Sequence, residues 1–346
     1  MPFEKWPELA EPAPLPRASR RMLLVSVAIG VAYGAIARVA FGHSALKDVF
    51  GVMTTTFLFL VPLGIGFATV WVGERQGRWS WWRRIFVPWL PAVLSLAAAL
   101  LLAWEGLICI FLWLPLFVLM ATIGGVLAGI IGTLVRSRRS RAAVLGGCLV
   151  LPFLVAPVEH RFGLPDEHRV VATDIEIRSD PATVWANIAR VPAIRPEELG
   201  FSWSHLIGFP RPIAATLSRE GVGGVRHATF EKGVLFVETV TAWEPERRLA
   251  FSIAADPASI PAAALDEHVT VGGPFFDVLD GEYQIEDVAP GRLILHLRST
   301  HRLSTSFNPY SGLWTDFIMR DVQTAILKVL KRRCEAGERP PAAEAG

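Results

Sequence analysis

The chain begins with five long hydrophobic segments separated by short polar stretches. Each segment has about the 20 helical residues that are needed to cross a hydrocarbon core of roughly 30 Å. The pattern therefore predicts an N-terminal all-α transmembrane bundle over residues 22–158. The five predicted helices are Met22–Phe41, Gly51–Val72, Ile85–Ala103, Gly106–Leu134 and Ala142–Val158.

The basic residues fall on alternate sides of these segments. Clusters of Lys and Arg precede the first segment, follow the second and follow the fourth, whereas the first loop carries only Lys47 and the third carries none. Because cytoplasmic loops carry the excess of Lys and Arg, residues 1–21 are predicted to be a cytoplasmic tail, and everything after Val158 to lie outside the cytoplasm. The clusters are Lys5, Arg17, Arg20 and Arg21; Arg75, Arg78, Arg83 and Arg84; and Arg136, Arg138, Arg139 and Arg141.

The net charge changes sign between the two halves of the chain. Residues 1–158 carry 14 Lys and Arg against 6 Asp and Glu, whereas residues 159–346 carry 20 against 26. An acidic soluble half is a poor nucleic-acid binder, because that affinity rests on neutralising phosphates. The Ala- and Arg-rich composition suggests a bacterial source, hence an inner-membrane protein with a periplasmic domain.

The hydrophobic segments carry signs of helix packing rather than of transport. Small residues recur at four-residue spacing, as in Gly30 and Gly34 or Gly125 and Gly129, and this spacing lets helices approach closely in lipid. Arg38 and Glu105 lie near the segment ends, whereas transporters place ionisable groups at mid-membrane. We expect a packed anchor through which homo-oligomers could also form. Its role beyond anchoring stays open.

After a predicted linker over residues 159–169, the hydrophobic period changes from helical to alternating. Asp180 and Pro181 predict a helix start, and a long amphipathic helix is expected from Gly312 to about Glu335. A curved antiparallel sheet that buries one face under this helix would form an α+β helix-grip fold. Residues 336–346 are expected to be a disordered tail. The predicted strands are Val170–Ile177, Ala214–Arg219, Val225–Glu231, Leu235–Trp243, Arg248–Ala254, His268–Val271, Asp277–Asp287 and Arg292–Leu303.

Several short motifs resemble one known superfamily. They are DPATVW at Asp180–Trp185, VTAWEPERRLAFSI at Val240–Ile253 and GLWTDFI at Gly312–Ile318. With the strand and helix order, residues 170–335 resemble the SRPBCC superfamily of START-like, polyketide cyclase/dehydrase and lipid-transport domains. The resemblance implies a deep, mostly apolar cavity between the sheet and the long helix. Members bind lipids or other hydrophobic molecules, and a minority catalyse cyclisation or dehydration.

Strand alternation indicates which residues would line such a cavity. In the last strand Leu293, Leu295, Leu297, Ser299 and His301 share one face, and this leucine face is expected to look at the helix. For each apolar candidate, core packing is as good an interpretation as ligand contact, and for His301 a satisfied core or rim histidine is the better one. The predicted ligand-binding set is Tyr283, Ile285, Leu295, Leu297, His301, Trp314 and Ile318.

No sequence motif identifies catalytic or metal chemistry. HExxH and CxxC spacings and a G-x-S-x-G elbow are absent, and His296 and His301 point to opposite faces of one strand. We therefore predict no cofactor, no metal and no assigned catalytic residue. The leading hypothesis is a membrane-anchored protein that binds a hydrophobic ligand or a membrane lipid. The alternatives are a cyclase- or dehydratase-type enzyme that uses the same pocket, through His301 or an inward carboxylate, with Glu238 and Asp277 as acidic candidates, and a non-catalytic partner-binding or sensory module.

Overall fold

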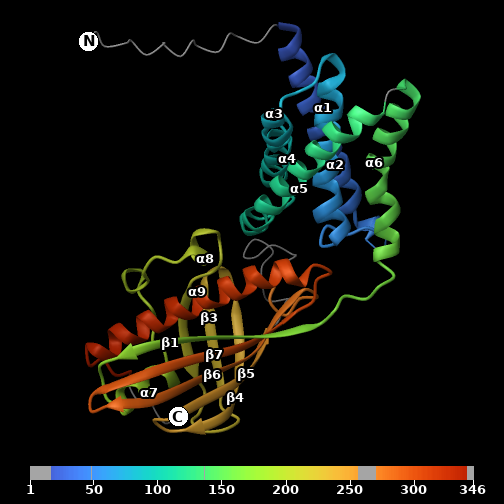
Figure 1. The fold of residues 1–346 in the computed structure, drawn as a ribbon. Helices are drawn as coiled ribbons and strands as arrows, with labels where there is room; N and C mark the ends of the chain where they lie inside the picture. Colours follow the sequence, from blue (N-terminus) through green and yellow to red (C-terminus); the bar gives the residue numbers. More distant parts are fainter. Residues whose placement is uncertain (1–16, 48, 136, 256–269, 341–346) are drawn as a thin grey trace, which may run out of the picture. The chain divides into compact units, whose positions relative to one another are not determined.

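The computed structural model describes residues 17–47, 49–135, 137–255 and 270–340 (Figure 1). The predicted cytoplasmic and C-terminal tails fall largely outside these residues. The chain divides into two compact units, each described here by itself. The first contains the described residues of Met1–Val52, Thr56–Leu96 and Leu116–Val158, and the second those of Met53–Thr55, Ala97–Pro115 and Glu159–Gly346.

Five helical stretches among the described residues are long and apolar enough to cross a membrane. The third is broken, because Pro88 lacks the backbone N–H that a continuous helix needs, so α3 ends at Phe86 and α4 begins at Trp89. The second begins as a π-helical turn over Thr56–Leu60. The helices are α1 (Arg17–Phe41), α2 (Val61–Gly73), α3 (Trp81–Phe86), α4 (Trp89–Leu101), α5 (Leu107–Leu134) and α6 (Arg138–Glu159).

Small residues allow the helices of the first unit to pack closely. A Cβ atom on Gly30 of α1 would lie 2.5 Å from Oγ1 of Thr69 in α2, too close for any real side chain. A Cβ on Gly66 of α2 would lie 1.8 Å from the carbonyl oxygen of Ala121 in α5. The helices therefore approach each other closely at these glycines, where a larger residue would not fit, as expected for helices packed in lipid.

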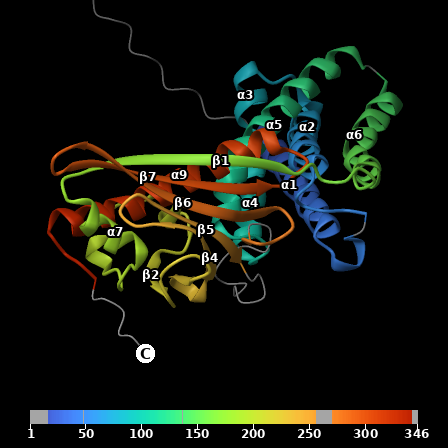
Figure 2. The same cartoon turned by 90° about the horizontal axis from the view of Figure 1, so that it is seen from below.

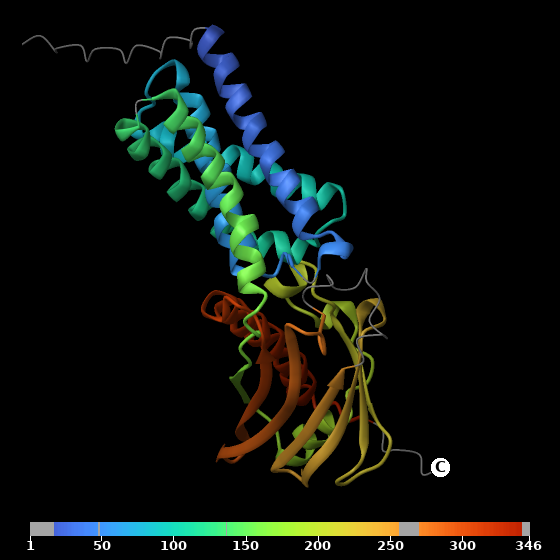
Figure 3. The same cartoon turned by 90° about the vertical axis from the view of Figure 1, so that its right-hand side faces the viewer.

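The second unit contains a curled antiparallel sheet, which in the described residues has seven strands in the order β1-β7-β6-β5-β4-β3-β2. The long helix α9 lies across one face of this sheet in all three views (Figures 1, 2 and 3). This is the predicted helix-grip fold. The strands are β1 (Glu167–Ile177), β2 (Pro212–Leu217), β3 (Val225–Phe230), β4 (Leu235–Glu244), β5 (Arg248–Ala255), β6 (Phe276–Ala289) and β7 (Arg292–Leu303), and the helices are α7 (Pro181–Ala189), α8 (Trp203–Leu206) and α9 (Asn308–Glu335).

In the second unit, three elements differ by three or more residues from the sequence-based expectation. Strand β1 begins three residues before Val170, because Glu167 already pairs with Leu303 of β7. Helix α9 begins at Asn308, four residues before Gly312, with a proline in its first turn. The predicted strand His268–Val271 lies half outside the described residues. Within them Val271 makes one isolated bridge to Phe276.

The concave face of the sheet carries the buried side chains. In β7 the leucine face predicted from alternation is buried together with Ser299 and His301. Helix α9 covers it with Ile318, Ala325 and Val329, which recur at helical spacing and are also buried.

Two of the sequence motifs meet in space. Asp180 caps α7, because its carboxylate accepts hydrogen bonds from the backbone N–H of Thr183 at 2.8 Å and from the Thr183 hydroxyl at 2.6 Å. The cap begins the helix that carries Trp185. This ring packs edge-on against Trp243 of β4, with 4.9 Å between ring centroids.

The convex face of the sheet carries a histidine held by two carboxylates. His296 of β7 has Nδ1 2.6 Å from Oδ1 of Asp174 in β1, and Nε2 3.0 Å from Oε2 of Glu286 in β6. Burial disfavours the charged imidazolium, but the hydrogen bonds to the two carboxylates outweigh it and hold the pKa of His296 above its usual value. Three strands are therefore tied together by one protonated ring.

This arrangement predicts a pH-dependent contribution to stability. Because the folded-state pKa is raised, the contribution is complete below the unfolded-state value of about 6.5 and is lost as the pH rises through the folded-state pKa. The gap in melting temperature between the wild-type protein and His296→Gln should be largest near pH 5.5 and should shrink towards pH 8.5. Thermal unfolding of the full-length protein in detergent measures this gap. The same change at His227, an exposed histidine of β3, should leave the melting temperature unchanged throughout; a gap that widens with pH would contradict the assignment.

Candidate ligand-binding cavity

A cavity of about 120 Å³ lies inside the second unit between the concave face of the sheet and helix α9. Its walls come from β2 to β7, from the segment after α7 and from the middle of α9. Most of the lining is aliphatic or aromatic, which is typical of small-molecule sites. Among the lining residues are Val191, Ile194, Phe230, Phe236, Phe251, Ile253, Val278, Leu297, Val322 and Ile326.

A buried ion pair lies in the wall of this inner cavity. Arg226 of β3 and Glu238 of β4 stand directly opposite each other in the ladder, and Nη1 of Arg226 donates to Oε2 of Glu238. The two side chains are only 5% and 7% exposed. The guanidinium also lies over the ring of Phe251, 5.3 Å from its centroid. Two opposite charges have therefore been removed from water, and each depends on the other.

The hydrogen-bonding capacity of this pair is not exhausted. Nε of Arg226 is buried and has no hydrogen-bond partner among the described residues. A guanidinium has five N–H groups and no acceptor atom. This N–H can therefore only donate, and its partner would have to be an acceptor such as an oxygen. Tyr283 of β6 lies in the same wall and is almost fully buried. Arg226 lines the cavity, so this buried N–H is a candidate donor for a polar group bound beside it.

Burial controls the protonation of the groups around the pair. It raises the pKa of the Glu238 carboxyl, and the guanidinium of Arg226 opposes part of this rise. Burial also raises the pKa of the Tyr283 phenol, so that this hydroxyl stays protonated at neutral pH. Arg226, Glu238 and Tyr283 are thus titratable groups gathered in one apolar wall, which is a common mark of a functional site.

The other polar groups of the inner cavity support the fold. Gln323 of α9 donates through Nε2 to the carbonyl of Val171 at 3.2 Å and to Oγ of Ser299 at 3.1 Å. Its Oε1 accepts from the Thr173 hydroxyl at 2.7 Å. One helix side chain is therefore bonded to β1 and β7 together, and it fixes α9 on the sheet.

A second cavity of about 80 Å³ adjoins the first at the N-terminal end of α9. We call it the mouth cavity. The side chains of Phe209 and Met319 line both cavities, so they form the partition between them. The other lining residues are Met53, Ile108, Cys109, Leu112, Trp113, Phe275, Phe276, Leu303, Thr305, Phe307, Tyr310, Ser311, Trp314, Thr315 and Ile318.

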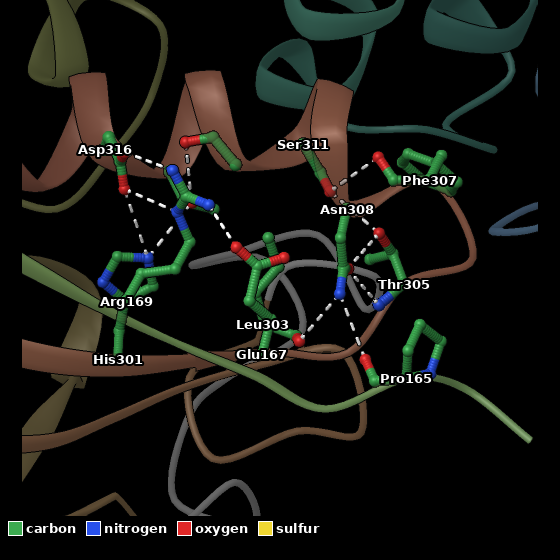
Figure 4. A network of polar contacts seen from close by, with 12 residues as sticks. Pro165, Glu167, Arg169, His301, Leu303, Thr305, Phe307, Asn308, Ser311 and Asp316 are labelled. Atoms are coloured by element: carbon green, nitrogen blue, oxygen red, sulfur yellow. Dashed lines mark hydrogen bonds and ion pairs between the residues drawn. The ribbon is translucent and has the colours of Figure 1, made fainter.

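A polar network beside the mouth fixes the start of α9 (Figure 4). Arg169 of β1 grips Asp316 with two hydrogen bonds, 2.9 Å from Nε to Oδ1 and 2.6 Å from Nη2 to Oδ2. The hydrogen bond from Arg169 is the main reason that the pKa of Asp316 lies below its usual value. Asn308 closes the turn after β7, since its Oδ1 accepts from the backbone N–H and the hydroxyl of Thr305 at 2.8 and 2.9 Å.

His301 belongs to this network rather than to a cavity wall. Its Nε2 lies 3.1 Å from Oγ1 of Thr315 and 3.7 Å from Oδ1 of Asp316, whereas its buried Nδ1 has no hydrogen-bond partner among the described residues. The Thr315 hydroxyl can donate to the carbonyl of Gly312, which leaves its oxygen to accept from Nε2–H. Burial lowers the pKa of His301, so the ring is neutral at pH 7.

The predicted ligand-binding residues separate into three places. Tyr283 and Leu297 line the inner cavity, and Trp314 and Ile318 line the mouth cavity. The structure places Ile285, Leu295 and His301 in the buried interior and in the lining of neither cavity. Ligand contact by any of the seven stays a prediction.

Sequence analysis named Glu238 as an acidic candidate but missed its partner Arg226. The signal was present in the alternation: Arg226 shares a strand face with Ala228 and Phe230, and Glu238 shares one with Phe236 and Val240. A charged residue on the apolar face of each of two neighbouring strands indicates an inward ion pair. No group of three or more His, Cys, Asp or Glu side chains that could hold a metal ion occurs among the described residues.

Comparison with known proteins gives only distant likenesses. No family model and no curated protein matches the chain. The match to a START superfamily protein from Mycobacterium smegmatis covers 49% of this chain and 99% of that protein, with 11% identity and a TM-score of 0.32. Norcoclaurine synthase from Thalictrum flavum, solved with dopamine and hydroxybenzaldehyde, covers 51% and 91%, with 11% identity and a TM-score of 0.32. DynU16, from the dynemicin biosynthetic locus, covers 49% and 48%, with 16% identity and a TM-score of 0.30.

These scores are too low to carry an argument about function. The chain spans about half the length of DynU16.

The ion pair leads to a prediction about stability. Arg226→Met should lower the melting temperature strongly, because it leaves Glu238 buried without its partner, a loss of roughly 3–5 kcal/mol for such pairs. The double change Arg226→Met with Glu238→Met should restore most of the loss, since apolar side chains suit the surrounding wall. Thermal unfolding of the three full-length proteins in one detergent tests this. A double variant as unstable as the single one would contradict it.

Proposed function

We propose that this protein is a membrane-anchored binding protein for a hydrophobic ligand that carries one oxygen-containing polar group. The observation that carries the proposal is the unpartnered Nε of Arg226 in the wall of a mostly apolar cavity. An apolar ligand body would replace water against the cavity walls, and its oxygen would accept the free N–H. A membrane lipid or another hydrophobic small molecule fits this description.

The membrane anchor is supported by the five apolar helices. Further support comes from the composition of the second unit. Beside the C-terminal half, it contains residues 53–55 and 97–115, which include residues of the first and third loops between the apolar helices of the structure. The positive-inside rule assigns these two loops and the C-terminal half to the same side of the membrane. We propose that this side is extracytoplasmic and that the membrane is a bacterial inner membrane.

The covalent link favours exchange of the ligand with the bilayer. Helix α6 ends at Glu159 and β1 begins at Glu167, so seven residues connect them. Even when fully extended, seven residues span at most about 25 Å. The tether therefore keeps the cavity within reach of the membrane surface, where hydrophobic molecules are concentrated.

Native mass spectrometry of the full-length protein released from mild detergent tests the proposal. We expect a stoichiometric hydrophobic adduct on the wild-type protein, identified after organic extraction. The adduct should fall at least fivefold in the variant Arg226→Met with Glu238→Met, which removes the polar anchor while keeping the wall apolar.

The matched control replaces a second cross-strand pair. Arg248 and Glu282 on β5 and β6 are 2.8 Å apart but partly exposed, and neither lines the cavities. Changing both to Met should leave the adduct intact. A wild-type protein that carries no adduct in several mild detergents and takes up none from added lipid extract would refute the binding function.

A second candidate is an acid-catalysed conversion of the bound ligand. The observation in its favour is that the carboxyl of Glu238 lies in the cavity wall with a raised pKa, as a general acid requires. Under this alternative, cells with Glu238→Gln should accumulate a molecule that differs from the wild-type adduct, whereas simple binding predicts the same molecule at lower occupancy. Comparison of the extracted adducts decides between the two.

A further inference from the structure

We infer that the ligand is a single-chain amphiphile that occupies both cavities at once, with its polar end at Arg226 and its chain passing between Phe209 and Met319 into the mouth cavity. This inference rests on the proposed function and specifies its ligand class. Three observations carry it: the polarity of the two cavities, the partition between them and the way in which that partition is built.

The two cavities differ in what they offer to a polar group. The inner cavity contains the buried N–H of Arg226 that has no partner among the described residues. The four hydroxyl groups that line the mouth are already bonded within the chain. Thr305 bonds to Asn308, Ser311 to the Phe307 carbonyl, Tyr310 to the Leu112 carbonyl and Thr315 to the Gly312 carbonyl. An amphiphile gains most by placing its polar end beside the buried, unpartnered donor of the inner cavity, so its chain lies at the mouth.

The two cavities share two lining side chains, an aromatic ring and a thioether. Phe209 and Met319 line both cavities, so a ligand that reaches from one to the other passes directly between them. One unbranched chain fits such a passage better than the glycerol and paired chains of a two-chain lipid.

One side of the passage is anchored and the other is adaptable. Phe209 follows the short helix α8, and its backbone N–H donates to the carbonyl of Ser204 at 2.9 Å. Helix α8 is in turn fixed to α9 through Asp321, which accepts from the Ser202 hydroxyl at 2.5 Å and from the Ser204 backbone N–H at 2.8 Å. Met319 is unbranched and can change rotamer without a large cost. We therefore assign the opening of the passage to Met319.

Photo-crosslinking with two forms of palmitic acid tests this placement. One form carries a diazirine next to the carboxylate, and the other carries it at the far end of the chain. In the full-length protein we expect the first to label peptides of β3 and β4, and the second to label the peptide of α9 that contains Phe307 to Ile318. A phosphatidylcholine with a diazirine in one chain should label the inner peptides at least tenfold less.

Substitution of Met319 tests the passage itself. Met319→Trp should reduce inner labelling at least fivefold and leave mouth labelling in place, whereas the volume-conserving Met319→Leu should keep both. Phe209→Trp is the independent blocking variant, and the melting temperature of each variant reports whether it folds.

The outcomes separate this inference from the proposed function. Saturable labelling of inner peptides by both palmitate forms would mean that the chain folds back inside; the binding function would then stand and the extended placement would be overturned. Equal inner labelling by the phosphatidylcholine would overturn the single-chain assignment alone. No saturable labelling with any probe, together with no adduct in mass spectrometry, would overturn both.

Discussion

The burial of opposite charges on neighbouring strands is the constraint on which the site depends. Moving a guanidinium and a carboxylate out of water is costly, and their attraction offsets the cost only if their geometry is well fixed. Arg226 and Glu238 obtain that geometry from their positions directly across the β3–β4 ladder. The ladder is in turn held by the remaining strands and by α9, which Gln323 fixes to β1 and β7. The pair is therefore present because of the cavity, and the same apolar surroundings make the burial of its two charges costly.

The polar groups of the domain divide into those that have hydrogen-bond partners and those that have none among the described residues. Around the start of α9, Arg169, Asp316, Asn308 and Thr305 bond to each other, and this part of the fold is fixed by well-formed contacts. In the inner cavity the Arg226 Nε–H is left over. A buried donor without a partner costs about 1–3 kcal/mol, and the proposed ligand would recover this cost by accepting the hydrogen bond.

The periodic parts of the sequence predicted the fold well because periodicity reports burial directly. Alternation along β7 assigned His301 to the inner face, and helical spacing identified Ile318 and Ala325 as buried. The pairing of Arg226 with Glu238 was harder to foresee, since the strand register that brings them together depends on the turn between β3 and β4. The break at Pro88 was missed because hydropathy averages over a window and does not register one absent N–H. The partition by Phe209 and Met319 joins residues 110 positions apart, and no local pattern reports such a contact.

The position of β1 in the sheet has a consequence for how the protein is made. Strand β1 is the first element of the sheet in the chain, yet its only partner strand among the described residues is β7, so that Glu167 pairs with Leu303. Contacts this distant in sequence have to wait for the closure of a long loop, and they slow folding. The first strand therefore stays unpaired until the last one has been synthesised and, in the proposed topology, has crossed the membrane. During that interval an exposed strand edge is open to wrong partners, so biogenesis rather than final stability is the stage at which this domain is most vulnerable.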